Sequence, residues 1–439
     1  MKKLLSVFTS VAMMFIMITG MTFNVNADIL KCGDYTYELL DDGTAQIKKY
    51  EGIKGNIEIP SVIDGKTVTS IGNCAFEDNR ALTEVIVPGS IKSIGDRAFF
   101  YCFGLKKITV SDKLEFIGIN AFGNTADEVY IDYSHNINKP DLYYGGTALQ
   151  WAKLVNGKTS FGWGFYTLHC AKQSKLDDFE IRLQGNKEIV IDGYYGDASN
   201  IVIPSKVEDY KVTAIVGNAF SSENKTVKKI TIGSNVKKID PAAFNLCPTL
   251  ESIVVSKNNN YFSSSNGVLY NKKKTKLIYF PSAKKCSSYK ISATVKSISE
   301  YAFYNSRGLK AITVAKDNKY FSAINGVLFN KKKTVLLAYP TGKASKSYTV
   351  PKSVKTIDSF AFVNCNHLQN IRISKNLSSV ELNGFYECMK IKNVYYSGSK
   401  SDWKKIGYHY VADNGKIKKA KYTLLASCMN NAKIHYKSI

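Results

Sequence analysis

The chain has 439 residues and carries 60 lysines and arginines against 36 aspartates and glutamates, a formal net charge of +24. This length allows two or three domains. A hydrophobic content of 44% excludes a wholly disordered chain. A mean hydropathy of −0.16, with one long apolar stretch, excludes a protein that crosses the membrane many times.

The N-terminal segment has the pattern of a signal peptide. Met1-Lys2-Lys3 precedes an uncharged run from Leu4 to Ile18, Thr19-Gly20 interrupts that run, and Val25-Asn26-Ala27 is similar to a cleavage site. A retained anchor helix is the alternative. The breaker and the cleavage-like triplet favour removal of residues 1–27. We therefore expect a secreted or cell-surface protein that contacts the membrane only through this segment, before cleavage.

The dipeptide Ala-Phe recurs along the chain and marks an internal repeat. An aliphatic residue stands five positions before each phenylalanine and another stands eight before it. The consensus ends in I-x-V, a β-branched alternation that predicts a short strand, and such a strand buries its apolar face only by stacking on its neighbours. We expect the phenylalanines to form a buried spine, with Phe99 and Phe244 almost fully covered. The copies are Phe76, Phe99, Phe122, Phe220, Phe244, Phe303 and Phe362, with Gly384-Phe385 as an eighth, degenerate copy.

The cysteines follow the same repeat. Four of the nine stand three residues after a spine phenylalanine, at the turn position of the unit: Cys102, Cys247, Cys365 and Cys388. This placement predicts small buried residues, with Cys102 and Cys365 as free thiols, rather than nucleophiles. The odd number says little about disulfides, and the lack of a C-x-x-C motif or of paired Cys/His spacing argues against a zinc site. We predict no metal and no cofactor.

The repeat unit, as in Ile94–Val110, resembles the leucine-rich repeat of BspA-like surface proteins. The resemblance covers essentially all of residues 28–439. It implies a right-handed leucine-rich-repeat solenoid dominated by parallel β-sheet, with short helical or 3-10 turns, and a surface or secreted location. For some members it implies adhesion to host matrix proteins or to cells. That binding chemistry maps onto no residue motif, so no site residue is carried over.

A constant offset of 144 residues aligns residues 57–76 with residues 201–220 and indicates a duplication. Turn residues around Asp42-Gly43 and at 184–186 predict β-hairpin caps before the two copies. Each copy also ends in a related segment, which contains Trp151 in the first and Trp403 in the second. The sequence thus predicts two solenoids, 28–170 and 177–439, each with a terminal Trp module.

Two inserts of 36 residues in the second solenoid carry the motif N-K-K-K-T between apolar segments, which predicts β-hairpins. No carboxylate occurs in 252–299 or in 318–357. We expect the two tips to lie about 10 Å apart on one side and to form a basic ridge. The candidate binding residues are Lys272, Lys273, Lys274, Lys331, Lys332 and Lys333.

The expected partner of this ridge is an anionic polysaccharide or a host or cell-surface protein. Nucleic acid is a poor candidate because the chain is exported and has only five arginines, the preferred base-reading side chain. Solvated turns that protect sheet edges from aggregation are the alternative.

No known catalytic motif is present. Adjacent residues of a strand face opposite sides, which disfavours His169-Cys170 as a catalytic pair. Asp41-Asp42 and Asp177-Asp178 fit turn residues better than a glycosidase pair. Trp151, Trp163 and Trp403 are open to sugar stacking or to end-cap packing. We predict a non-enzymatic extracellular binding or adhesion protein. The alternative is a secreted enzyme acting on cell-wall or host glycans, with an active site dispersed over the repeats.

Overall fold

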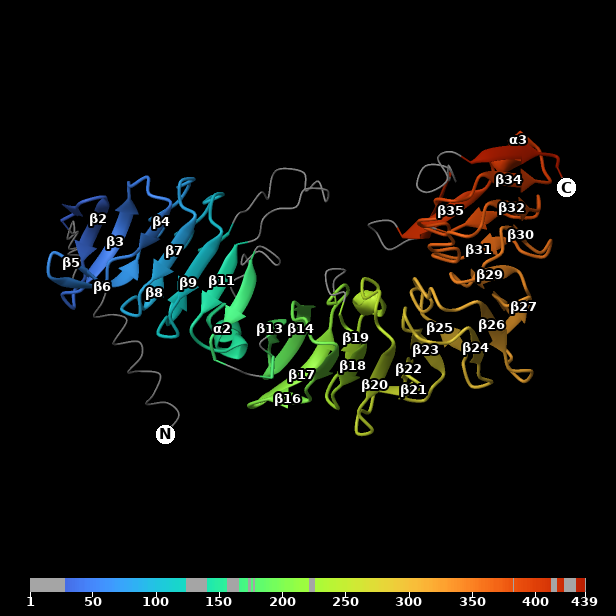
Figure 1. Ribbon diagram of the computed structural model, residues 1–439, viewed down its shortest axis with the longest axis horizontal. Coiled ribbons are helices and arrows are strands. Elements are labelled where there is room, and N and C mark those ends of the chain that lie inside the picture. The colour runs from blue at the N-terminus through green and yellow to red at the C-terminus, as the bar shows by residue number, and fades with distance from the viewer. Residues whose placement is uncertain are drawn as a thin grey trace, which may run out of the picture. The chain divides into compact units, whose positions relative to one another are not determined.

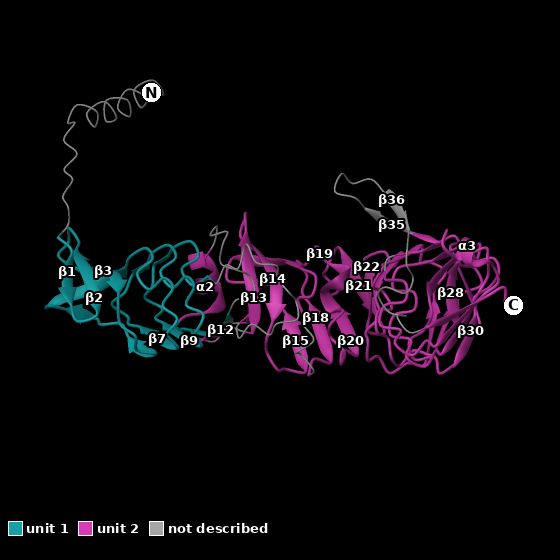
Figure 2. Cartoon of the chain, turned by 90° about the horizontal axis from the view of Figure 1, so that it is seen from above, with its two compact units in different colours: residues 1–145, 157–167 teal, residues 146–156, 168–439 magenta. Residues whose placement is uncertain are grey.

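The computed structural model describes residues 28–123, 140–155, 166–172, 175–176, 178–220, 226–381, 383–411, 417–421 and 432–438. The predicted signal peptide, Trp163, Asp177 and Cys428 lie outside these residues. The chain forms two compact units, Met1–Gly145 with Gly157–Thr167, and Gly146–Asn156 with Leu168–Ile439 (Figure 2). The boundaries 28–170 and 177–439 stay predictions. Within the described ranges, no helix has the length and apolarity needed to cross a membrane.

The first unit begins with an antiparallel cap and continues as stacked coils (Figure 1). The cap strands are β1 (Leu30–Cys32), β2 (Tyr35–Leu39) and β3 (Ala45–Tyr50), which confirms the hairpin predicted around Asp42-Gly43. From β3 a parallel ladder runs through β6 (Lys66–Ile71), β8 (Ser93–Ile94) and β10 (Phe116–Ile117), with β5 (Val62–Ile63) antiparallel to β6. A second parallel ladder contains β4 (Asn56–Glu58), β7 (Glu84–Val87), β9 (Lys107–Val110) and β11 (Asp141–Tyr144). After it comes β12 (Thr167–Cys170).

The second unit starts from a cap of the same kind, with one added helix. The strands β13 (Phe179–Gln184) and β14 (Glu188–Tyr194) pair antiparallel, which confirms the second predicted hairpin. The helix α2 (Ala148–Val155) buries Ala148 and Leu149 in the same core cluster as Phe179.

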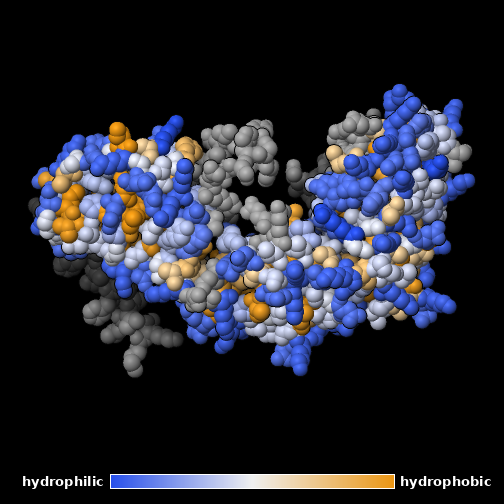
Figure 3. All heavy atoms as spheres, viewed as in Figure 1, coloured by the Kyte–Doolittle hydropathy of each residue, from blue (hydrophilic) through white to orange (hydrophobic). Residues whose placement is uncertain are grey.

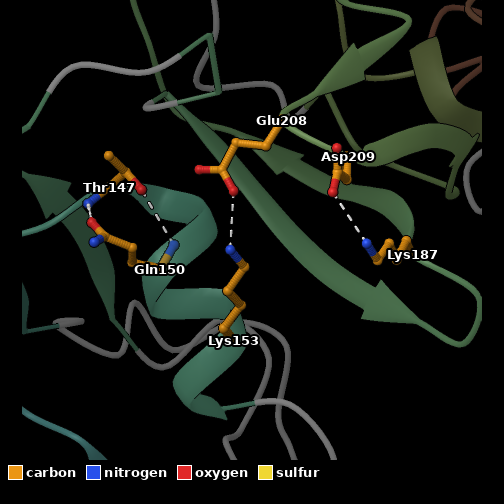
Figure 4. Close-up of polar contacts among 6 residues, drawn as sticks. All are labelled: Thr147, Gln150, Lys153, Lys187, Glu208 and Asp209. Atoms are coloured by element: carbon orange, nitrogen blue, oxygen red, sulfur yellow. Dashed lines mark hydrogen bonds and ion pairs between the residues drawn. The ribbon is translucent and has the colours of Figure 1, made fainter.

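Side-chain contacts explain where α2 begins and how it is held (Figure 4). Thr147 Oγ1 accepts the Gln150 N–H at 3.2 Å, and Gln150 Oε1 accepts the Thr147 N–H at 2.8 Å, so the two residues form a capping box. Lys153 pairs with Glu208 at 3.0 Å in the turn before β17. Both groups of this ion pair are exposed, so it orients α2 and adds little stability.

Parallel pairing then continues through the second unit. The strand β14 pairs parallel with β17 (Tyr210–Ile215), which pairs parallel with β19 (Lys238–Ile239) and antiparallel with β16 (Lys206–Val207). A 3-10 helix spans Pro241–Phe244, with Asp240 as its N-cap. Further parallel ladders of this unit form separate sheets. One contains β15 (Asn200–Ile203), β18 (Lys229–Ile232) and β20 (Ser252–Val255), and another contains β24 (Ser288–Ile291) and β26 (Ala311–Val314). A further one contains β30 (Ser347–Thr349), β32 (Asn370–Ile373), β34 (Asn393–Tyr396) and β37 (Lys433–Tyr436).

Each 36-residue insert forms a three-stranded antiparallel meander, so the predicted hairpins are confirmed and each gains a strand. The first meander is β21 (Phe262–Ser265), β22 (Val268–Asn271) and β23 (Lys276–Tyr279), and β23 then pairs parallel with β25 (Ser297–Ile298). The second is β27 (Phe321–Ile324), β28 (Val327–Asn330) and β29 (Val335–Ala338). The sheet that contains this second meander continues through β31 (Thr356–Ile357), β33 (Ser379–Val380), β35 (Gly407–Val411) and β36 (Ile417–Lys421). The helix α3 (Lys400–Trp403) precedes β35 in the chain.

The phenylalanine spine exists as predicted. Phe99 is 2% exposed and stacks between Phe76 and Phe122, with ring centroids at 4.7 and 5.4 Å. Phe244 is 0% exposed and stacks on Phe220 at 5.6 Å. Trp151 and Trp403 are buried, which confirms the packing interpretation over sugar stacking for these two residues.

Buried thiols of the repeat should resist alkylation until the fold melts. Cys102 and Cys365 are buried and free, and burial raises the pKa of the Cys102 thiol to about 12. Since only the thiolate reacts, we expect iodoacetamide at pH 8 to spare both residues in the native protein and to label both in denaturant. Exposed Cys74 is the internal control. Mass spectrometry that finds Cys102 labelled as fast as native Cys74 would contradict the assigned burial.

Candidate binding surface

The first N-K-K-K-T motif forms a compact turn between β22 and β23. Asn271 Oδ1 accepts the backbone N–H groups of Thr275 at 2.8 Å and Lys276 at 2.9 Å, and Asn271 Nδ2 donates to Thr275 Oγ1 at 2.8 Å. Lys274 takes a left-handed conformation with φ +52°. The asparagine side chain thus replaces the backbone partners that the turn lacks, which explains the asparagine and threonine at its two ends.

The second motif, 59 residues later, has the same geometry. Asn330 Oδ1 accepts from Thr334 at 2.8 Å and Val335 at 3.1 Å, and Lys333 has φ +59°. Each tip is also tied to the following coil, because Thr294 Oγ1 donates to the Lys274 carbonyl and Ser353 Oγ donates to the Lys333 carbonyl. The two turns therefore occupy equivalent places in the two inserts. Their predicted separation of about 10 Å stays a prediction.

The six lysines of these turns do not have equal roles. Lys272 Nζ donates to the Lys257 carbonyl at 3.1 Å and to the Asn259 carbonyl, and Lys331 Nζ donates to the Asn318 carbonyl at 2.6 Å. These two ammonium groups help to hold the loop before each meander. The other four lysines are exposed, and their ammonium groups have no hydrogen-bond or ion-pair partner within the described part of the chain: Lys273, Lys274, Lys332 and Lys333.

The surroundings of the turns are basic and hydrophilic. Lys285 belongs to the carboxylate-free segment 252–299. It pairs with Glu251 at 3.3 Å, a carboxylate that lies just outside that segment. Hydrophilic residues cover most of the surface over β29 to β34 in Figure 3. We name Lys272–Lys274 and Lys331–Lys333 together the lysine turns.

Two buried asparagines behind the lysine turns were missing from the predicted site. Asn259 and Asn318 are buried, and each side chain hydrogen-bonds four backbone groups. Their carbonyls receive the Lys272 and Lys331 ammonium groups. The sequence does hold a signal for them, because both inserts have an asparagine two residues before a tyrosine.

The catalytic candidates do not form a site. His169 is exposed while Cys170 is partly buried, as expected for neighbours on a strand. Asp42 accepts the Thr44 hydroxyl and N–H at 2.6 and 3.0 Å, contacts that lower its pKa and close the cap turn. Among the residues with described positions, no three His, Cys, Asp or Glu side chains gather as metal ligands would.

Several solved structures are similar to this chain. The chain is similar to a leucine-rich cell surface protein from Faecalibacterium prausnitzii (22% identity, 86% of this chain and 97% of that chain, TM-score 0.44). It is also similar to a leucine-rich repeat protein from Eubacterium ventriosum (22%, 84% and 84%, TM-score 0.33) and to the pneumococcal vaccine antigen PcpA (16%, 94% and 99%, TM-score 0.28). No curated protein matches.

The repeat itself identifies the family. The BspA type leucine-rich repeat region matches residues 50–151, 172–285, 274–335 and 338–432, in 6 copies. These ranges cover most of the chain and include most strands of the stacked coils and of the two meanders. The chain therefore belongs to the BspA type leucine-rich repeat family.

Proposed function

We propose that this protein is an extracellular, non-enzymatic binding or adhesion protein whose lysine turns hold an anionic polysaccharide. Leucine-rich repeat proteins of this family are generally binding proteins without enzymatic activity. The N-terminal signal pattern supports export. The observation that carries the proposal is a pair of equivalent turns from segments without a carboxylate, each with two exposed ammonium groups that have no partner among the described residues.

Electrostatics explains why a polyanion suits these turns. Like charges held near each other repel, and a polyanion with repeated sulfate, phosphate or carboxylate groups relieves that repulsion. A lysine ammonium is a point charge without the bidentate geometry of arginine, so binding should be broad rather than selective. At 0.15 M salt the Debye length is about 8 Å, so only closely apposed polyanions gain much.

Replacing all six lysines of the turns with glutamine should leave the fold intact and lower the salt concentration at which the protein leaves a heparin column. If four to six ammonium groups contact the polyanion, the magnitude of the slope of log K against log salt should fall by about 3–4, by analogy with single-stranded nucleic acids. Circular dichroism checks the fold, and salt-dependent titration gives the slope.

Two controls separate the turns from net charge. The Lys→Arg variant of the same six residues keeps the charge and should bind at least as tightly as the parent does. A second variant removes six exposed lysines elsewhere in the unit: Lys206, Lys211, Lys228, Lys229, Lys238 and Lys375. If this variant loses as much affinity as the turn variant, or if the turn variant elutes with the parent, the lysine turns are only a solvated face. Sustained hydrolysis of a glycan by the purified protein would instead favour an enzyme.

A further inference from the structure

The parallel ladder of the second unit is interrupted between β25 and β29. The strand β25 pairs with β23, while β29 pairs with β28 and β31 in a separate sheet. Backbone bonds join coils on both sides of the break, from Phe280 N to Ala302 O and from Tyr339 N to Ala361 O, each at 2.7 Å. A cavity of about 250 Å³ lies at the break, lined by residues of β25, β29 and the turns that follow β25 and β31.

In the first insert, a tyrosine side chain fills the equivalent space. Tyr279, the last residue of β23, is fully buried, with its ring 5.3 Å from Phe244 and its hydroxyl donating to the Phe244 carbonyl at 2.9 Å. Its counterpart 59 residues later is Ala338, which ends β29 and lines the cavity beside Phe303, the counterpart of Phe244. Because alanine has no ring, room for one large side chain stays open at the break between β25 and β29.

The cavity wall combines an unpaired hydroxyl, carboxylates and aromatic rings. Ser299 is 7% exposed, and its Oγ has no hydrogen-bond partner among the described residues. Asp358 and Glu300 bring two carboxylates, and Asp358 Oδ1 accepts the Ser359 N–H at 3.1 Å. The rings of Tyr304 and Phe360 lie edge to face at 5.5 Å.

These groups suit a cationic ligand. Carboxylate oxygens accept hydrogen bonds, and aromatic faces attract ammonium groups. A buried hydroxyl without a partner is rare, and a ligand in the cavity would supply one for Ser299. Burial raises the pKa of Asp358 to about 6, with Glu381 and Glu300 adding to the rise. Lys296 is the basic residue among those that line the cavity, and it is exposed.

We propose that this cavity binds a lysyl side chain of a partner protein, with the ammonium group between the Asp358 carboxylate and the Ser299 hydroxyl and the methylenes against Phe360 and Tyr304. A volume of about 250 Å³ is smaller than the roughly 300–1,000 Å³ of sites for drug-sized ligands and fits one side chain. The ligand has the opposite charge to the polyanion proposed for the lysine turns. This site is therefore independent of that function.

The test is titration of the full chain with Nα-acetyl-lysinamide, followed by NMR at pH 7.5 and low salt. We expect Nα-acetyl-norleucinamide, which lacks the charge, to bind at least tenfold more weakly. Ala338→Tyr copies the first insert, should fold, and should reduce lysine binding at least tenfold. Asp358→Asn should weaken it similarly, whereas Asp317→Asn, an exposed carboxylate outside the cavity, should have no effect.

The pH profile gives an independent readout. Since the Asp358 carboxylate is protonated below its pKa, lysine binding should fall about tenfold from pH 7.5 to pH 5, and the profile should be flat in Asp358→Asn. The other charged residues around the Asp358 carboxyl, which are Glu300, Glu381 and Lys296, are not substituted in that variant. Equal binding of the norleucine probe, unchanged binding by Ala338→Tyr, or tighter binding of Nα-acetyl-argininamide would each overturn the proposal. The six-lysine variant should bind the lysine probe as the parent does.

Discussion

Replacing Phe99 with alanine should lower the free energy of unfolding by about 3–5 kcal/mol, because it leaves a large cavity in a close-packed core. The ring stacks on both Phe76 and Phe122, so the substitution breaks the spine in the middle of the first unit. The coils of a solenoid contact only their neighbours, so we expect the loss to be strongest in the coils on either side.

Phe103→Ala is the matched control, since this ring belongs to the same coil and is 56% exposed. Its removal should change stability by no more than about 0.5–1 kcal/mol, through lost contact with Tyr101. Urea unfolding followed by circular dichroism measures both variants, and hydrogen exchange locates the loss. Similar destabilisation by the two substitutions would show that stacking along the spine does not dominate the stability of this unit.

Asn259→Ala should cost about 3 kcal/mol or more, because four buried backbone groups would lose their partner together. Asn259 is 0% exposed; its Nδ2 donates to the Gly233 and Val236 carbonyls at 2.9 Å, and its Oδ1 accepts from Tyr261 and Phe262 at 2.8 Å. The side chain thus ties the first meander to the preceding coil. We expect amide exchange at Tyr261 and Phe262 to accelerate along with the loss of stability.

The neighbouring Asn260 is exposed and offers a control with the same chemical change. Asn260→Ala should stay within about 0.5 kcal/mol of the parent in urea unfolding. Asn318→Ala should reproduce the large effect in the second meander, where Asn318 donates to the Ser292 and Val295 carbonyls. If Asn259→Ala is as mild as Asn260→Ala, water replaces the amide and the asparagine is not needed to fix the loop.

Local periodicity made much of the fold predictable. The recurrence of Ala-Phe predicted a buried spine because every coil meets its neighbour at the same position, and Phe99 and Phe244 lie where that register requires. Asp42-Gly43 predicted the first cap because such residues close hairpins. The N-K-K-K-T motif likewise predicted the turns between antiparallel strands.

The candidate site was only partly predictable. The sequence named six lysines as one group, but the fold divides them, since Lys272 and Lys331 reach backbone carbonyls of the loop that precedes each meander. Those acceptors become available only when β21 and β27 form and bring the loop next to the turn. No sequence pattern distinguishes a lysine that points to solvent from one that reaches such a carbonyl.

The sequence by itself determined the repeat, the family, the caps and the hairpins, because each depends on residues close together in the chain or on a register repeated from coil to coil. Only the tertiary structure decided what lies between coils. In the sequence, Tyr279 of the first insert simply corresponds to Ala338 of the second. In the structure, Ala338 lies at the break between β25 and β29, where the missing ring leaves a cavity. Ser299 and Asp358 are 59 residues apart, and stacking alone brings them to the same wall.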